Sequence, residues 1–105
     1  MDATLPLNGS MPAYLYLFAK TFIEAGVKNG ISYDISKELT ARSIIASAQM
    51  ILDSEDSIDT LINNVCSKGG TTIAGLYELY DNNFEEAIKK CYDACVNRSI
   101  ELSKK

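Results

Sequence analysis

The chain has 105 residues, of which 47% are hydrophobic and 23% charged, with a formal net charge of −4. This length suits one globular domain at most, and the acidic balance argues against a nucleic-acid partner, which usually requires a basic face. No stretch is long and apolar enough for a membrane span and the start lacks the features of a signal peptide, so the expected location is cytoplasmic, with no membrane partner.

The first predicted helix runs from about Ser10 to Lys28. Ser10 is a candidate N-cap, and Pro12 suits the first turn, where its missing N–H is not needed. Asn29-Gly30 is a typical C-terminal signal. Residues 13–19 are apolar on nearly all sides, which predicts that other protein mass encloses them, and a domain this small has little of its own to offer.

The second predicted helix opens near Ser32 or Tyr33 and continues to about Ser54. Its apolar stripe is formed by Ile35, Leu39, Ile44, Ala48 and Ile51 or Leu52. Small residues permit another helix to approach closely, namely Ala41, Ser43, Ala46, Ser47 and Ala48. At about 30 Å the helix is long for so small a protein, which is typical of an interface helix.

Three further helices complete an all-α domain of about five helices, since no segment alternates like a strand. A short helix has Ser57 as its cap. The fourth runs from about Thr71 to Tyr80. The last begins at Asn83, with Glu86 three residues on as a capping box, and ends at Lys104 and Lys105.

The three cysteines are Cys66, Cys91 and Cys95, an odd number without the spacing of a disulfide framework. The favoured interpretation is that these cysteines are small hydrophobic core residues whose thiols stay reduced. A metal pair at Cys91 and Cys95 would need further ligands, and the chain has no histidine, so no metal site is expected.

The loop from Ser67 to Thr72 is the one segment with the character of a binding site. Gly69 and Gly70 let the backbone turn sharply and let a ligand approach it closely. The helix that follows directs free N–H groups at the loop, and Ser67, Thr71 and Thr72 add hydroxyls. A carboxylate would fit such a nest of amides.

Plainer interpretations exist for each candidate residue. Gly-Gly-Thr-Thr is also an ordinary turn between helices with a threonine cap, which local spacing alone favours. Glu55 could face a cationic ligand nitrogen, yet it also reads as a solvated acid among Asp53 and Asp56. The chain contains no nucleophile–base pair and no nucleotide-binding GxGxxG turn, so by itself it cannot perform hydride transfer.

Three motifs in order resemble the pyrroline-5-carboxylate reductase family and together cover nearly the whole chain. Residues 65–76, Val-Cys-Ser-Lys-Gly-Gly-Thr-Thr-Ile-Ala-Gly-Leu, resemble its Ser-Pro-Gly-Gly-Thr-Thr-Ile-Ala-Gly-Leu signature. Residues 9–14, Gly-Ser-Met-Pro-Ala-Tyr, resemble the Gly-Ser-Gly-Pro-Ala-Tyr start of its C-terminal domain. Residues 24–30, Glu-Ala-Gly-Val-Lys-Asn-Gly, are similar to its Asp-Ala-Gly-Val-Lys-x-Gly stretch.

The resemblance implies that residues 1–105 are a helical dimerisation and substrate-binding domain, intertwined as a homodimer like the C-terminal domain of 6-phosphogluconate dehydrogenase. An N-terminal Rossmann domain is absent from this chain. The family reduces 1-pyrroline-5-carboxylate to L-proline with NADPH or NADH, in proline biosynthesis, and the isolated chain is expected to be inactive. We expect a dimer through the first two helices, with an interface above about 2,000 Å².

The resemblance also implies roles for individual residues. The amides near Gly69, Gly70, Thr71 and Thr72, with the Ser67 hydroxyl, would hold the substrate carboxylate. Thr72, as the catalytic residue, and less surely Glu55, would face the ring nitrogen. Gly9, Ser10 and Met11 would lie near the nicotinamide of a cofactor bound mainly by the missing domain.

Four residues depart from the family pattern. Lys68 stands in place of a proline, Met11 of a glycine, Leu5 of a threonine and Asn8 of a serine. The alternative is therefore a helical dimerisation module of a diverged paralogue, without retained catalysis. Another reductase of the 6-phosphogluconate dehydrogenase group would share the architecture but is not expected to carry this Gly-Gly-Thr-Thr run.

Overall fold

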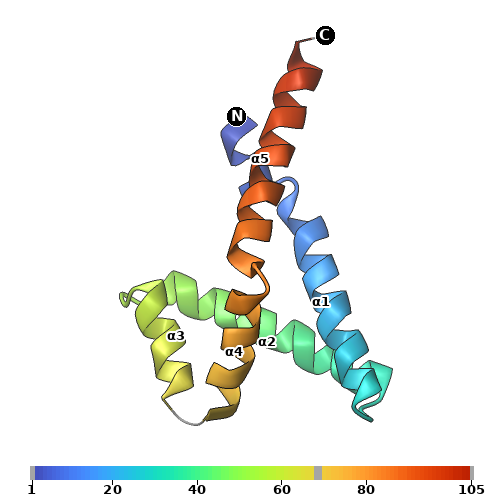
Figure 1. Ribbon diagram of the computed structural model, residues 1–105, viewed down its shortest axis with the longest axis vertical. Helices are drawn as coiled ribbons and strands as arrows, with labels where there is room; N and C mark the ends of the chain where they lie inside the picture. The colour runs from blue at the N-terminus through green and yellow to red at the C-terminus, as the bar shows by residue number, and fades with distance from the viewer. Residues whose placement is uncertain (1, 68–69, 105) are drawn as a thin grey trace. The chain divides into compact units, whose positions relative to one another are not determined.

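The computed structural model describes residues 2–67 and 70–104. Within these ranges the chain forms one short 3₁₀ helix and five α-helices and contains no strand (Figure 1). They are η1 (Asp2–Leu7), α1 (Met11–Lys28), α2 (Tyr33–Asp53), α3 (Ile58–Cys66), α4 (Gly70–Asp81) and α5 (Phe84–Ser103). The all-α prediction is confirmed, and η1 is an element that the sequence did not predict.

The helices divide into two compact units. The hairpin unit is Asn8–Glu55, and the terminal unit joins Met1–Leu7 to Asp56–Lys105. The hairpin unit is therefore an insertion between the two parts of the terminal unit.

In the hairpin unit, α1 and α2 are joined by a tight turn. The Asn29 amide donates to the carbonyls of Ala25 and Gly26, at 3.1 Å each. Gly30 has a φ of 93°, a left-handed conformation that favours glycine. The Ser32 hydroxyl then caps α2 by accepting from the Ile35 amide at 3.2 Å. Each residue of this turn thus satisfies a helix end or reverses the chain.

The two helices of the hairpin pack closely at Gly26. A Cβ atom placed there would lie 2.6 Å from the Ser36 hydroxyl oxygen and 3.2 Å from the Ser36 Cβ. Ser36 is buried, and its hydroxyl has no hydrogen-bond partner among the described residues. Glycine is required here because the side chain of the neighbouring helix fills the space that a Cβ would need.

In the terminal unit, η1 lies along α5 (Figure 1). The Tyr92 hydroxyl donates to the Ala3 carbonyl, and the Ser99 hydroxyl donates to the Asp2 carboxylate at 2.5 Å. Pro6 of η1 is buried. These contacts join residues 89 and 97 positions apart in the sequence, which explains why local patterns gave no sign of η1.

The helix ends confirm some of the predicted caps and contradict others. Ser57 caps α3 by accepting from the Thr60 amide at 3.1 Å, as predicted. The Ser10 side chain makes no capping bond to α1, and Asn83 makes none to α5. The capping-box prediction at Asn83 is wrong because its backbone is left-handed, with a φ of 62°, whereas an N-cap usually has extended backbone. Asparagine tolerates that conformation better than most residues, and here it forms the turn between α4 and α5.

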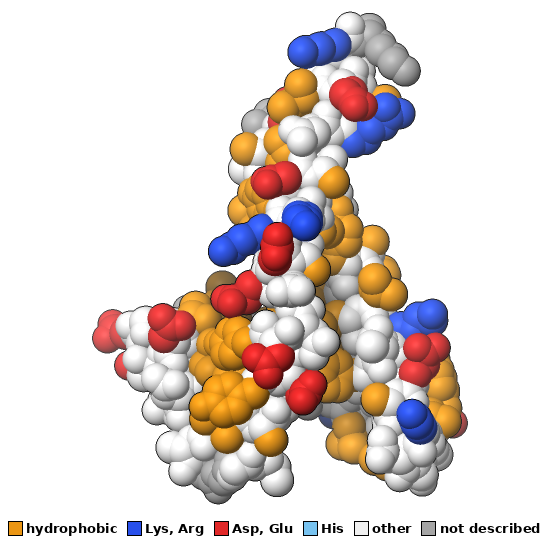
Figure 2. All heavy atoms as spheres, viewed as in Figure 1, with side chains coloured by type: hydrophobic (Ala, Val, Ile, Leu, Met, Phe, Trp, Pro, Cys, Tyr) orange, Lys and Arg blue, Asp and Glu red, His pale blue; other side chains and the backbone are white. Residues whose placement is uncertain are grey.

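The described residues have almost no core of their own. Ile23 in α1 and Pro6 in η1 are the only hydrophobic residues among them that are buried. Hydrophobic side chains reach the surface, with acidic and basic ones interspersed (Figure 2). In α2 the exposed large hydrophobics are Tyr33, Ile35, Leu39, Ile45, Met50, Ile51 and Leu52.

The apolar opening of α1 is not enclosed by this chain. Leu15 is 40% exposed, Tyr16 73% and Leu17 63%. The cysteines are likewise half-buried rather than buried, and no disulfide joins them. This chain does not provide the predicted enclosure, so protein outside the chain would have to supply it.

Candidate functional site

The glycine-rich loop connects the end of α3 to the start of α4. Ser67 is the C-cap residue of α3, and its amide donates to the Asn63 carbonyl at 2.9 Å. Gly70 is the first residue of α4, one position before the predicted start. Lys68 and the predicted site residue Gly69 lie outside the described residues.

The first turn of α4 presents backbone amides that have no acceptor in residues 2–67 and 70–104. Among the described residues, none accepts a hydrogen bond from the amides of Gly70, Thr71 or Thr72. All three residues are exposed. Unpaired amides at a helix N-terminus carry partial positive charge, so this turn can accept an anion in a way that a helix interior cannot.

Gly70 is not explained by the chain's own packing. A Cβ at this position would meet no described atom within 4 Å, and the backbone is not left-handed. The same is true of Gly75, one turn further into α4. A glycine inside a helix costs roughly 0.5–1 kcal/mol relative to alanine. Contacts among the described residues therefore do not account for the small size at these positions.

The hydroxyl groups of the loop differ in their engagement. The Ser67 hydroxyl donates to the Asn64 carbonyl at 3.0 Å, so it must rotate before it can donate to a ligand. Thr71 and Thr72 are exposed, and no described residue bonds to their hydroxyls. In this conformation the amides and the two threonines, rather than Ser67, are ready to donate.

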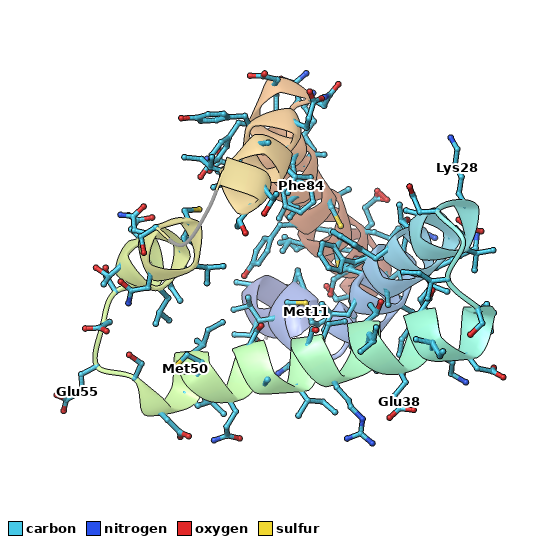
Figure 3. All side chains as sticks on the ribbon, turned by 90° about the horizontal axis from the view of Figure 1, so that it is seen from below. Met11, Lys28, Glu38, Met50, Glu55 and Phe84 are labelled. Carbon is cyan, nitrogen blue, oxygen red and sulfur yellow. The ribbon has the colours of Figure 1, made fainter. Side chains whose placement is uncertain are left out.

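The other predicted site residues belong to the hairpin unit. Glu55 is exposed and extends beyond the end of α2 (Figure 3). Gly9 is exposed, while Ser10 and Met11 are half-buried at the start of α1. The loop lies in the terminal unit, so the joint roles of these residues remain predictions.

A shallow depression at the junction of α4 and α5 was missed by the sequence patterns. Tyr80, Asn83, Glu85, Glu86 and Lys89 line it. Lys90, nearby on α5, pairs with Glu86 at 3.4 Å on the exposed surface. The side chains that line it include no nucleophile–base pair.

The described residues contain neither a cluster of metal ligands nor a helix that could cross a membrane. Within residues 2–67 and 70–104, histidine, cysteine and acidic side chains form no cluster of three that could hold a metal ion. No described helix combines the length and apolarity that crossing a bilayer requires.

Together, the fold and the loop define a class of protein. A helical domain whose described helices expose so much apolar surface is typical of a module that is completed by other protein. Residues 1–102 match the family model for pyrroline-5-carboxylate reductase dimerisation. The chain belongs to this family, as the dimerisation domain.

Relatives from distant organisms agree with this assignment. The chain is 41% identical over 98 residues to a pyrroline-5-carboxylate reductase of Staphylococcus haemolyticus, covering 93% of the chain and 36% of the relative. It is 36% identical over 102 residues to pyrroline-5-carboxylate reductase 2 of Rattus norvegicus, covering 97% of the chain and 32% of the relative. The chain thus spans about a third of these proteins.

A solved structure shows the same fold. The Plasmodium falciparum pyrroline carboxylate reductase, which has NADP bound, superposes with a TM-score of 0.90 at 38% identity. The match covers 94% of this chain and 40% of that one.

Proposed function

We propose that the protein to which this chain belongs reduces 1-pyrroline-5-carboxylate to L-proline with NADPH or NADH, and that residues 1–105 act as its dimerisation and substrate-binding domain. Family membership supports the reaction class. The observation that carries the substrate role is the exposed first turn of α4, where the amides of Gly70, Thr71 and Thr72 have no acceptor among the described residues.

The substrate carboxylate fits this turn by charge and by size. Its two oxygens can accept from adjacent amides at the positive end of α4. The open space at Gly70 lets the carboxylate approach the backbone without meeting a side chain. Such charge-assisted bonds fix the orientation of a small ring as well as adding affinity.

Thr72 is the residue that we assign to the reacting end of the substrate. Its hydroxyl would face the ring nitrogen, which becomes cationic as the imine is protonated and thereby makes the neighbouring carbon more electrophilic. A role for Glu55 at this nitrogen remains a prediction. The cofactor supplies the hydride when bound, and the exposed Gly9 with the half-buried Ser10 and Met11 would border its nicotinamide.

A homodimer completes the proposal. The exposed apolar residues of α1 and α2 are too numerous for a stable soluble monomer with so little buried, and a second copy would cover them. Sedimentation of the purified chain tests this. A well-folded monomer at micromolar concentration would contradict the dimer. The cytoplasmic location remains a prediction.

The reaction is tested in the protein that contains this chain together with its nucleotide-binding domain. Thr72→Val removes the hydroxyl but keeps the branched shape, and Thr72→Ser keeps the hydroxyl. We expect kcat/KM to fall by about 10²-fold in the first and by much less in the second. Thr21→Val is the matched control, because the Thr21 hydroxyl serves only the Leu17 carbonyl of its own helix. Undiminished turnover in Thr72→Val would remove Thr72 from the mechanism.

A dimerisation module without a retained site is the second candidate, favoured by the extent of exposed apolar surface. NMR titration with proline or a cyclic carboxylate analogue separates the two. Shifts confined to the amides of residues 70–72 support the substrate site. If the protein with both domains shows no shifts at these amides, the result supports the dimerisation module without a retained site.

A further inference from the structure

Two Asn-Gly pairs in the chain differ sharply in structure. They are Asn8-Gly9, between η1 and α1, and Asn29-Gly30, after α1. Asn-Gly is the dipeptide in which the amide nitrogen of the second residue most readily attacks the side-chain carbonyl carbon of the first, because glycine adds no side chain to hinder the ring closure. The surrounding hydrogen bonds then decide whether the attack can occur.

At Asn8 the two reacting groups are in contact through a hydrogen bond with each other. The Gly9 amide N–H donates to the Asn8 side-chain oxygen Oδ1, with the nitrogen 2.5 Å from that oxygen. Because Oδ1 is bonded to the carbonyl carbon Cγ at about 1.2 Å, the nitrogen is no more than about 3.7 Å from the carbon it must attack. That is close to the separation of about 3–3.5 Å found in near-attack geometries. Both residues are exposed, so water has access to them.

At Asn29 both reacting groups are held apart. The Gly30 amide donates to the Val27 carbonyl at 3.0 Å, and the Asn29 side-chain amide donates to the Ala25 carbonyl at 2.8 Å. The Asn29 backbone amide is bonded to α1 as well. Ring closure here requires the C-terminal cap of α1 to open first.

We propose that Asn8 is a site of spontaneous deamidation in the folded protein and that the cap of α1 protects Asn29. The Gly9 nitrogen loses its proton to solvent base and forms a bond to Asn8 Cγ. The bond from Cγ to the side-chain nitrogen then breaks, and ammonia leaves with a proton from water. Water next opens the succinimide at either carbonyl, giving aspartate or isoaspartate. No oxidant, metal or enzyme is needed.

The product changes the segment ahead of α1. A carboxylate replaces a neutral amide two residues before Ser10, and the isoaspartate form also lengthens the backbone there by one carbon. The protein becomes more acidic by one charge, which isoelectric focusing resolves. In either product the new negative charge lies immediately before Gly9–Met11.

The test is a time course of the folded protein at mildly alkaline pH, digested and analysed by peptide mass spectrometry at both sites. We expect Asn8 to convert at least about tenfold faster than Asn29, because the Asn29 site must break its hydrogen bonds first. In concentrated urea, where both sites lose their structure, we expect the two rates to converge. Asn8→Ser removes the side-chain amide that reacts at the first site. Loss of the acidic product in this variant identifies Asn8 as its source.

Three results would overturn the proposal. They are equal rates in the folded protein, a faster reaction at Asn29, and a rate ratio that is unchanged in urea. The last would show that the flanking sequence, rather than the folded backbone, sets the difference. Detection of isoaspartate at Asn8 in the folded protein, together with convergence in urea, would support it.

Discussion

Gly26 in α1 and Gly75 in α4 are both helical glycines, yet their surroundings are opposite. A Cβ at Gly26 would collide with Ser36 of the neighbouring helix, whereas a Cβ at Gly75 would meet no described atom within 4 Å. The first glycine is explained by packing within the chain. The second, like Gly70, has no explanation within it. The contrast separates a position that packing within the chain explains from positions where a partner or a ligand remains to be tested.

The largest effect is expected from a charge on the exposed apolar face of α2, which tests whether a partner covers that face. Leu39 is 57% exposed, so a glutamate there is harmless if the chain is a monomer. If a second copy covers the face, we expect Leu39→Glu to cost about 3–5 kcal/mol of dimer free energy, since an unpaired charge is buried. Analytical ultracentrifugation over a concentration series measures this.

Arg42→Gln is the control, because it changes the net charge equally. Arg42 is exposed and pairs with Glu38 at 2.8 Å, and Glu38 projects from α2 away from α1 (Figure 3). We expect its effect to stay within about 0.5 kcal/mol. Equal effects of the two substitutions would count against an apolar dimer face.

The next largest effect is expected at the helix crossing of the hairpin unit. Gly26→Ala should destabilise the fold by about 1–2 kcal/mol, because overpacking outweighs the gain in helix propensity. Adding Ser36→Ala removes the nearest atom and should recover part of the loss, which a double-mutant cycle in urea detects. A stabilising Gly26→Ala would show that the two helices do not pack in this way.

Two tyrosines of the terminal unit differ in the same way, because one contacts another element of the chain and the other is exposed. Tyr92 ties α5 to η1 through the Ala3 carbonyl, whereas Tyr77 is 57% exposed. We expect Tyr92→Phe to cost about 0.5–1.5 kcal/mol and to increase hydrogen exchange in η1. Tyr77→Phe should leave both nearly unchanged. If Tyr92→Phe does not affect η1, the contact does not hold that segment.

The smallest effect concerns Gly75 itself. In the isolated chain Gly75→Ala should stabilise α4 by about 0.5–1 kcal/mol, through helix propensity alone. Thermal unfolding at a fixed, low protein concentration measures it. A change of sign on dimerisation or on addition of substrate would show that a partner or ligand approaches α4 at this point. Stabilisation in every state would mean that the glycine serves no contact.

Local signals predicted the elements that local contacts build. The Asn29-Gly30 turn and the Ser57 cap were readable because every group involved lies within a few residues. η1 was not, since its partners on α5 are far away in sequence. The left-handed Asn83 also escaped, because an asparagine followed by Glu86 has the same pattern whether its backbone is extended or left-handed.

For the candidate site, the sequence predicted where Gly70, Thr71 and Thr72 lie, at the exposed start of α4, because a glycine-rich loop before a helix is a local pattern. Their role in binding a substrate stays a prediction. The engagement of the Ser67 hydroxyl with Asn64 could not be predicted, since serine bonds its own helix or a ligand equally well. The predicted roles of Glu55 and Met11 depend on groups outside this chain.

The pairing of η1 with α5 also has a consequence for the order of folding. The α1–α2 hairpin closes over a short turn, so it can form early, even while the rest of the chain is being synthesised. η1 precedes the hairpin in the sequence, yet Ala3 meets Tyr92 only after the intervening 89-position separation has been spanned. Closing a loop of that length carries a larger entropic penalty than closing the hairpin. η1 is therefore expected to settle after the hairpin that follows it in the sequence, once α5 has formed and bonded to it.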